Sequence, residues 1–264
     1  MRGFLSGEDP NIARFRRVMR RLPHGPNCKL CAAPFEGPAG AVLRHVGFAR
    51  FAGNPAICGS CIKSLNKLGI FGAEIPVSLL FADIRGSTGI GERSSPSEFR
   101  AYLDRFYQLS SRAILENDGI VDKFVGDEAI GLFFAGISGA EHAAAAVRAA
   151  RALLDEVGRA DASPSGPIPV GAAVHTGDAF VGSTGAGGTV TDFTALGDVV
   201  NITARLASEA AAGEVLVSIR AAKAAGYLGS SAFDHRTLNV RGRSDAVEVV
   251  AIRSTLPGVP FETL

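Results

Sequence analysis

The spacing of apolar and polar positions predicts a mixed helix and strand fold for most of the chain. An apolar run over residues 77–84 predicts a buried strand that ends at a carboxylate, Asp83. A capping box over residues 95–98, with proline at the first helical position, predicts the start of a helix. Apolar residues at helical spacing follow it, so one face of this helix should point inward.

The next elements continue this alternation. Two short apolar runs within residues 120–134, separated by Gly126-Asp127, predict a β-hairpin. An alanine-rich helix is expected over residues 140–157 and a strand over residues 170–175, with a further strand beginning at Phe180. The order strand, helix, hairpin, helix, strand predicts an α+β protein with a ferredoxin-like βαββαβ core and additions.

A basic amphipathic helix is predicted near the N-terminus, over residues 11–22. Apolar side chains share one face, and five arginines surround the rest. For so short a helix, packing of the apolar face on the protein's own body is the favoured interpretation. The alternative is a peripheral contact with an acidic partner or a membrane surface.

All four cysteines of the chain fall into two Cys-x-x-Cys pairs, Cys28 with Cys31 and Cys58 with Cys61. Four thiolates in this arrangement match the tetrahedral ligand set of a structural Zn²⁺, in a zinc-ribbon-like module. An iron centre or a redox dithiol is the less favoured alternative. Such modules sometimes bind nucleic acid but more often hold structure or a protein contact.

Composition narrows the functional classes. The 264 residues include 27 Lys and Arg against 26 Asp and Glu, and a net charge of +1 gives no electrostatic case for nucleic-acid binding. No apolar run is long enough for a membrane span and no secretory signal is evident, so a cytoplasmic protein is expected. The expected organisation is a basic helix at 1–23, a zinc-binding module and linker at 24–72, a catalytic domain at 73–256 and a tail at 257–264.

Two carboxylates are candidate metal ligands. Asp83 lies at the end of an apolar run, and Asp127 lies between two apolar runs. If their strands are neighbours, both side chains emerge at one edge of the sheet and can share Mg²⁺ ions, which would suit two-metal phosphoryl transfer. The plainer interpretation is that each aspartate forms a turn or caps a helix.

A third polar group lies in residues 193–206. Gly197 should break the chain and Asp198 should cap a helix, on which Asn201 and Arg205 are four residues apart and share a face. Such a pair could orient a sugar and neutralise a phosphate. The alternative is a solvated polar face.

Together these motifs resemble the class III nucleotidyl cyclases, over about residues 77–253. The resemblance rests on Phe81-Ala82-Asp83-Ile84-Arg85-Gly86-Ser87-Thr88, Lys123-Phe124-Val125-Gly126-Asp127, Val174-His175-Thr176-Gly177, and Leu196-Gly197-Asp198-Val199-Val200-Asn201 through Arg205. It implies that Asp83 and Asp127, with the carbonyl of Ile84, hold two Mg²⁺ or Mn²⁺ ions in each active site.

The same resemblance assigns the substrate contacts. Lys123 and Thr194 would read the purine, and a lysine that donates to adenine N1 favours ATP over GTP. Asn201 would fix the ribose, and Arg205 would stabilise charge that develops on the α-phosphate. Arg241 stands where the family usually has a lysine that contacts the terminal phosphates.

The implied protein is an adenylyl cyclase in signal transduction, which would convert ATP to 3′,5′-cyclic AMP and pyrophosphate. In this family the active site lies between two catalytic domains, so a chain with one such domain is expected to form a homodimer, with the zinc module positioning or regulating it. The alternatives are a guanylyl cyclase and a catalytically silent nucleotide-binding regulatory module.

Overall fold

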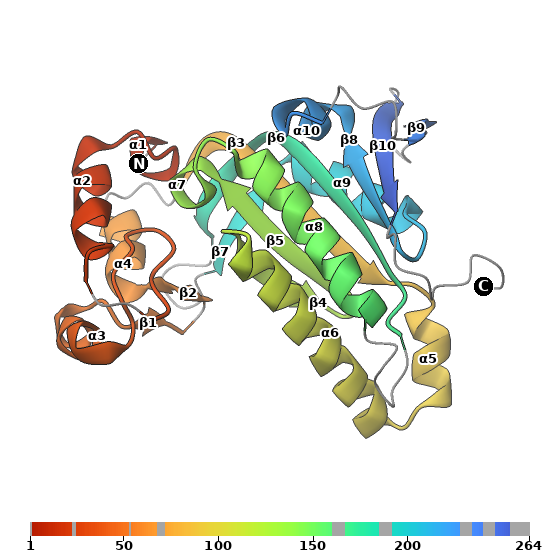
Figure 1. The fold of residues 1–264 in the computed structure, drawn as a ribbon, viewed down its shortest axis with the longest axis horizontal. Helices are drawn as coiled ribbons and strands as arrows, with labels where there is room; N and C mark the ends of the chain where they lie inside the picture. Colours follow the sequence, from red (N-terminus) through yellow and green to blue (C-terminus); the bar gives the residue numbers. More distant parts are fainter. Residues whose placement is uncertain are drawn as a thin grey trace.

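The computed structural model places an N-terminal module beside one large mixed sheet with helices on both faces (Figure 1). The first and last strands of the sheet are far apart in sequence. The structure describes residues 2–22, 25–52, 54–67, 72–159, 167–184, 192–227, 234–239 and 246–253.

The predicted ferredoxin-like core is confirmed. Its four strands lie in the order β4-β5-β3-β6, and β3 is antiparallel to both β5 and β6. This is the strand order of a βαββαβ unit. The core elements are β3 (Gly72–Ile84), α6 (Pro96–Glu116), β4 (Ile120–Val125), β5 (Glu128–Phe134), α8 (His142–Arg159) and β6 (Val170–Thr184).

Additional elements surround this core, and most of them follow β6 in the chain. Strands β8, β10 and β9 continue the sheet, while β7 pairs with the C-terminal part of β6. The added elements are α5 (Ser87–Arg93), α7 (Ala135–Ser138), β7 (Asp192–Leu196), α9 (Asp198–Glu209), β8 (Glu214–Ser218), α10 (Ile219–Ala224), β9 (Asp234–Leu238) and β10 (Val247–Arg253).

Alternate residues of β3 serve opposite faces of the sheet, as the two-residue period of a strand requires. Leu80 packs into the apolar layer under α6 and α8, together with Phe106. Leu79 and Phe81 pack into the layer on the other face, which also contains Leu206 of α9. Both faces of this strand are therefore buried, which explains its near-continuous apolar sequence.

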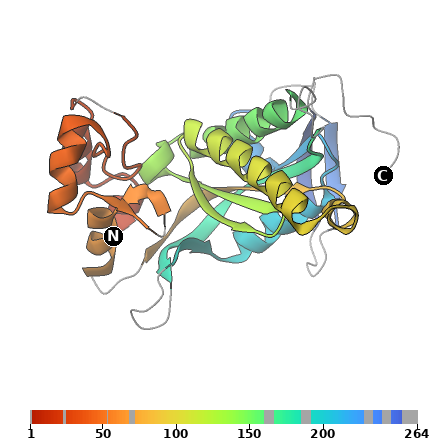
Figure 2. The same cartoon turned by 90° about the horizontal axis from the view of Figure 1, so that it is seen from below.

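The N-terminal module lies at one end of the sheet in both views (Figures 1 and 2). We use this name for the elements α1 (Arg2–Leu5), α2 (Pro10–Met19), α3 (Gly37–Leu43), η1 (Arg44–Val46), β1 (Arg50–Phe51), β2 (Asn54–Cys58) and α4 (Gly59–Lys67).

The apolar face of the basic helix α2 packs against the rest of the protein. The side chain of Asp9 caps the helix by accepting from the amide of Asn11 at 2.8 Å. The ring of Phe15 stacks on that of Phe48, with centroids 5.9 Å apart. Within the described parts of the chain, no helix is long and apolar enough to cross a membrane.

Two details of the sequence analysis are wrong. β6 runs unbroken from Val170 to Thr184, so no new strand begins at Phe180. The N-cap of α9 is Gly197, and Asp198 is the first helical residue. Gly197 has φ of 148°, a value that side-chain-bearing residues rarely adopt, so the glycine takes the capping position.

Candidate active site

The two predicted carboxylates meet at one edge of the sheet. Asp83, the second-last residue of β3, lies directly opposite Glu128 of β5, and the amide of Ile84 donates to the carbonyl of Asp127 at 3.2 Å. This backbone hydrogen bond joins the end of β3 to the turn of the β4–β5 hairpin. We call Asp83, Asp127 and Glu128 the carboxylate edge; the backbone of Ile84 belongs to the same place.

Burial raises the pKa of Asp83 to about 6, an effect that the charge of Arg85 opposes and that of Asp127 reinforces. Burial also raises the pKa of Glu128 to about 7, and the charges of Asp83 and Asp127 add to this. Crowded, partly desolvated carboxylates repel one another until a cation joins them. Their oxygens are the ligands that hard divalent cations prefer, so this donor set fits Mg²⁺ or Mn²⁺.

Two neighbours hold the carboxylates in place. The guanidinium of Arg85 donates to Asp83, and the hydroxyl of Ser87 donates to Asp127. Arg85 also donates to the carbonyl of Ser208 at 3.0 Å, which ties this edge to the end of α9.

The sequence analysis assigned no role to Arg85, Ser87 or Glu128. The available signal for Glu128 was its place directly after Asp127 at the start of a strand. It becomes informative only when the register sets it opposite Asp83.

A second polar group joins β4 to β7, and we call it the β4–β7 cluster. The Nζ of Lys123 lies 2.7 Å from Oδ2 of Asp192, and the hydroxyl of Thr194 donates to Oδ2 of Asp122 at 2.9 Å. The structure thus brings the two predicted purine-reading residues together. It also adds two carboxylates that the sequence analysis did not single out.

Electrostatics favour a charged lysine here. Burial by itself would lower the pKa of Lys123, but the hydrogen bond to Asp192 and the charges of Asp122 and Asp192 outweigh it, so the pKa is raised. Lys123 therefore stays protonated, and an ammonium group only donates hydrogen bonds.

The predicted phosphate-directed pair lies on α9. Asn201 is exposed and Arg205 is half-buried, one helical turn further on. Within the described part of the chain, neither side chain has a hydrogen-bond or ion-pair partner. Arg241 lies outside the described residues.

The two polar groups are separate within one chain. Across the described residues, no hydrogen bond or ion pair links the carboxylate edge with the β4–β7 cluster. α5, which begins four residues after Asp83, lies at the end of the molecule opposite the N-terminal module (Figure 1). The β4–β7 cluster instead adjoins the module, because Lys123 and Asp192 line the cavity between the module and the sheet.

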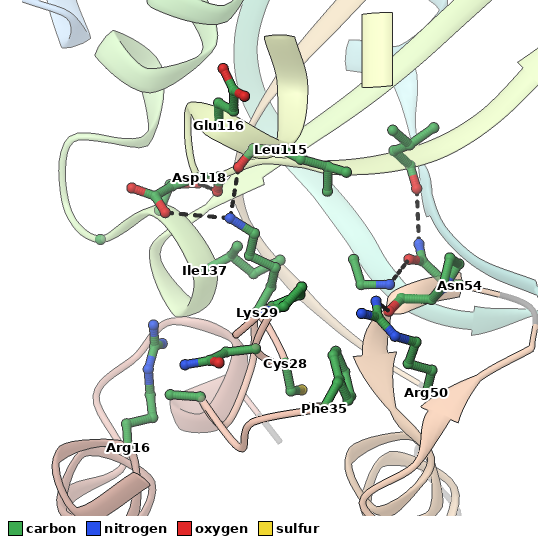
Figure 3. A pocket seen from close by; sticks show the side chains of 18 of the residues that line it. Arg16, Cys28, Lys29, Phe35, Arg50, Asn54, Leu115, Glu116, Asp118 and Ile137 are labelled. Carbon is green, nitrogen blue, oxygen red and sulfur yellow. Dashed lines mark hydrogen bonds and ion pairs between the residues drawn. The ribbon is translucent and has the colours of Figure 1, made fainter. Parts of the chain in front are cut away.

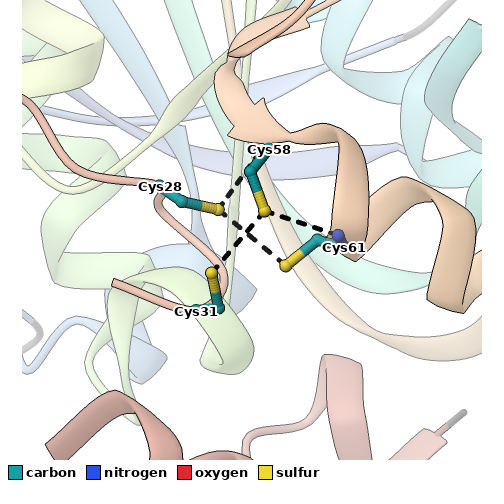
Figure 4. Close-up of side chains that lie close together, drawn as sticks. All are labelled: Cys28, Cys31, Cys58 and Cys61. Atoms are coloured by element: carbon teal, nitrogen blue, oxygen red, sulfur yellow. Dashed lines mark hydrogen bonds between the residues drawn. The ribbon is translucent and has the colours of Figure 1, made fainter. Parts of the chain in front are cut away.

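The four cysteines converge on one point (Figure 4). All four sulfurs lie within 4.8 Å of one another, with 3.9 Å between Cys28 and Cys61 and 3.7 Å between Cys31 and Cys58. Tetrahedral zinc with Zn–S bonds of about 2.3 Å requires sulfurs about 3.8 Å apart. The amide of Cys58 also donates to the sulfur of Cys28 at 3.2 Å, which stabilises a thiolate. The site therefore fits Zn²⁺.

Residues next to these cysteines attach the module to the sheet domain (Figure 3). Lys29 donates to the carbonyl of Leu115 at 2.7 Å and lies 3.6 Å from Asp118. The buried Asn54 donates to the carbonyl of Val121 in β4 at 2.8 Å. A cavity of ≈ 1430 Å³ lies between the two parts.

Comparison with known proteins shows a family match over more than half of the chain. The model of the family described as "Adenylate and Guanylate cyclase catalytic domain" matches residues 73–253. "Adenylate cyclase 1" of Rhizobium meliloti is 35% identical over 136 residues, which are 49% of this chain and 20% of that protein. "Adenylate cyclase" of Anabaena cylindrica is 29% identical over 163 residues, 60% of this chain and 32% of that protein. The chain thus spans a third or less of these relatives.

Solved structures show the same fold. The guanylyl cyclase Cya2 superposes with a TM-score of 0.64 at 27% identity, over 72% of this chain and 97% of that one. The adenylyl cyclase CyaB from P. aeruginosa superposes with a TM-score of 0.59 at 28% identity, over 70% of this chain and 98% of that one.

The cysteine geometry predicts about one zinc ion per purified chain. Cys61→Ser should lose the metal and lower the melting temperature, because zinc binding contributes directly to the stability of so small a module. The neighbouring Ser60→Ala should retain both. Elemental analysis and thermal unfolding of the three proteins check this, and a zinc-free wild type of full stability would contradict it.

The raised pKa of Glu128 predicts a pH-dependent stability without added Mg²⁺ or Mn²⁺. The folded chain binds this proton more tightly than the unfolded chain, so the contribution of Glu128 to the free energy of unfolding should fall from pH 4.5 to about 7. Glu128→Gln should therefore raise the melting temperature at pH 8 and have little effect below pH 4.5. The exposed control Glu116→Gln should leave both values nearly unchanged. Equal melting temperatures of wild type and Glu128→Gln at pH 8 would refute the assignment.

Proposed function

The chain belongs to the family of adenylate and guanylate cyclase catalytic domains, and from this premise we propose that it is an adenylyl cyclase. It would convert ATP to 3′,5′-cyclic AMP and pyrophosphate. The observation that carries the choice of ATP is the position of Lys123 beside Thr194. A protonated lysine donates to the N1 acceptor of adenine, whereas the N1–H of guanine would meet a second donor.

In this proposal the carboxylate edge handles the reacting phosphate. Asp83, Asp127 and the carbonyl of Ile84 would hold two Mg²⁺ or Mn²⁺ ions. When bound, these ions supply the charge that lowers the pKa of the ribose 3′-hydroxyl and screens the triphosphate. The 3′-oxygen loses its proton and bonds to the α-phosphorus, while the bond from that phosphorus to the bridging oxygen breaks and pyrophosphate leaves.

The helix α9 would contact the ribose and the α-phosphate of the same nucleotide. The exposed amide of Asn201 would orient the ribose, and the guanidinium of Arg205 would stabilise charge on the α-phosphate. Both residues follow Gly197 on the helix that packs across the sheet. We assign Arg241 to the terminal phosphates on the strength of the family motif alone.

The separation of the two polar groups supports a homodimer with active sites at its interface. One chain presents the carboxylate edge at one place and the β4–β7 cluster at another, without a hydrogen bond or ion pair between them in the described residues. A two-fold axis would bring the carboxylate edge of one chain to the β4–β7 cluster and α9 of the other. Structural zinc would hold the N-terminal module against the β4–β7 side of each chain.

A guanylyl cyclase is the second candidate, because the fold is shared with a guanylyl cyclase at 27% identity. The choice between the two nucleotides depends on the β4–β7 cluster. The adenylate cyclase names of the two curated relatives support ATP.

The dimer predicts complementation between two inactive variants. Asp83→Asn and Arg205→Ala should each reduce cyclic AMP formation by at least about 100-fold, since each damages both sites of its own dimer. Co-expressed with different tags, they should recover about a quarter of wild-type activity, because half of the dimers would carry one intact site of two. Glu209→Ala, an exposed change on the same helix, is the control and should stay active. Absence of recovery in isolated mixed dimers would refute a shared site.

If Lys123 reads the base, replacing it with glutamate should shift the nucleotide preference from ATP toward GTP. Glutamate there would accept from N1–H of guanine, but beside Asp122 and Asp192 it would add a third negative charge. Lys123→Glu should therefore be combined with Asp192→Asn. The ratio of kcat/KM for ATP over GTP should fall at least about tenfold. Asp192→Asn alone should keep the preference for ATP, and an unchanged ratio in the double variant would remove Lys123 from base reading.

A further inference from the structure

We propose that Asp122 determines base specificity by fixing the direction of the Thr194 hydroxyl, so that the Thr194 oxygen accepts a hydrogen bond from the 6-amino group of adenine. This inference rests on the proposed adenylyl cyclase function and names a residue that controls its selectivity. Asp122 acts through Thr194 and is therefore a positioning residue.

The contact between the two side chains is well defined. Thr194 is 5% exposed, and its hydroxyl lies 2.9 Å from Oδ2 of Asp122. Few conformations are open to a threonine side chain packed in this way, because its branched Cβ restricts rotation. Among the described residues, Oδ2 of Asp122 is the acceptor for the proton of this hydroxyl.

A β-bulge makes this contact available. The register of β4 on β5 shifts between Val121, opposite Gly131, and Lys123, opposite Ile130, so Asp122 is the extra residue. Consecutive strand residues normally point to opposite faces, and a bulge re-aims one of them. Asp122 and Lys123 thus both reach β7, where Thr194 and Asp192 are two residues apart and share a face.

Hydrogen-bond polarity then decides which base fits. An ionised carboxylate only accepts, so the single proton of the Thr194 hydroxyl must point to Asp122. The Thr194 oxygen can then only accept a further hydrogen bond, through a lone pair. The exocyclic amino group of adenine donates, whereas the O6 of guanine accepts and would face this lone pair without a proton between them.

The ionisation state supports this arrangement at neutral pH. Burial raises the pKa of Asp122 to about 6, while the charge of Lys123 and the hydrogen bond from Thr194 oppose the rise. The carboxylate is thus mostly charged above pH 7. Its other oxygen, Oδ1, is buried without a hydrogen-bond partner among the described residues. An incompletely satisfied buried carboxylate is costly, which favours a functional reason for its presence.

The bulge is also held from outside the sheet. Asn54 of the N-terminal module donates to the carbonyl of Val121, the residue directly before Asp122. The Oδ1 of the same Asn54 accepts from the amide of Ala56 at 3.1 Å, so its amide orientation is set within the module. The position of Asp122 is therefore fixed from both sides.

Three nucleotides separate the contribution of the 6-position from that of N1. ATP, GTP and purine riboside 5′-triphosphate are used, because the last keeps N1 as an acceptor but lacks the 6-amino group. The wild type should use ATP about tenfold more efficiently, in kcat/KM, than the purine analogue. In Asp122→Asn this preference should fall at least about fivefold, because an amide can donate to Thr194 and release its proton. The efficiency with the purine analogue itself should change little.

Variants of Thr194 provide the matched controls. Thr194→Ser keeps the hydroxyl and should keep the preference, whereas Thr194→Val should abolish it. Adding Asp122→Asn to Thr194→Val should have no further effect on the preference, since the two residues act through one hydrogen bond. Zinc content and melting temperature report on folding, and Asp122→Ala replaces Asp122→Asn if the latter does not fold.

The outcomes are distinguishable. An ATP preference over the purine analogue that survives Asp122→Asn, or Asp122→Ala where that variant replaces it, overturns the role of Asp122 and leaves the adenylyl cyclase standing. An equal loss of kcat/KM for all three nucleotides shows a merely structural role and also overturns it. A wild type that prefers GTP, or that cyclises no nucleotide, overturns the proposed function and this inference together.

Discussion

The pairing of β3 with β6 is the constraint on which the rest of the structure depends. Every residue of β3 is paired, from Gly72 opposite Gly182 to Ile84 opposite Val170. This long ladder carries Asp83 to one end of the sheet. On its other edge β6 pairs with β8 only over residues 172–174, so its C-terminal part can pair there with β7. The positions of both polar groups therefore follow from one register, and a slip of a single residue would turn Asp83 to the other face.

The N-terminal module is integrated with this sheet rather than tethered to it. Its buried residues Leu30, Ile57 and Ile62 belong to the same apolar cluster as Ile75 and Val77 of β3. Polar contacts to the end of α6 and to β4 come from Lys29 and Asn54, side chains close in sequence to the four cysteines. These contacts connect the cysteine cluster to β4, the strand that carries Lys123.

Local signals in the sequence predict much of the fold. The capping box at Ser95 begins α6 as expected, and the Gly126-Asp127 turn joins β4 to β5. The continuity of β6 was missed because Gly177 and Asp178 are typical of a break. Gly177 is small for another reason: a Cβ there would lie 3.0 Å from Val199 of α9. Close helix packing and a turn can both require glycine, so only the structure distinguishes the two explanations.

Some residues of the candidate site were also predictable from local sequence patterns, and others were not. Motif residues such as Lys123 and Asp127 were found in the sequence because their spacing is characteristic. Glu128, Asp122 and Asp192 were not, because their significance depends on cross-strand register, on a bulge and on the approach of β7. These are long-range properties that no local pattern records. Residues that reach the site through long-range contacts are thus harder to predict than residues that belong to local motifs.

A common feature of the two polar groups is that burial raises carboxylate pKa values where no protein cation fully compensates. Asp83 and Glu128 are raised at one group and Asp122 at the other. Ionising them costs stability, so the fold alone does not explain their presence. At the carboxylate edge, a bound cation would offset this cost. At the β4–β7 cluster, the charge of Lys123 and the hydrogen bond from the Thr194 hydroxyl both lower this cost. In these proposals, this electrostatic cost favours a bound cation at the carboxylate edge and a fixed direction of the Thr194 hydroxyl at the β4–β7 cluster.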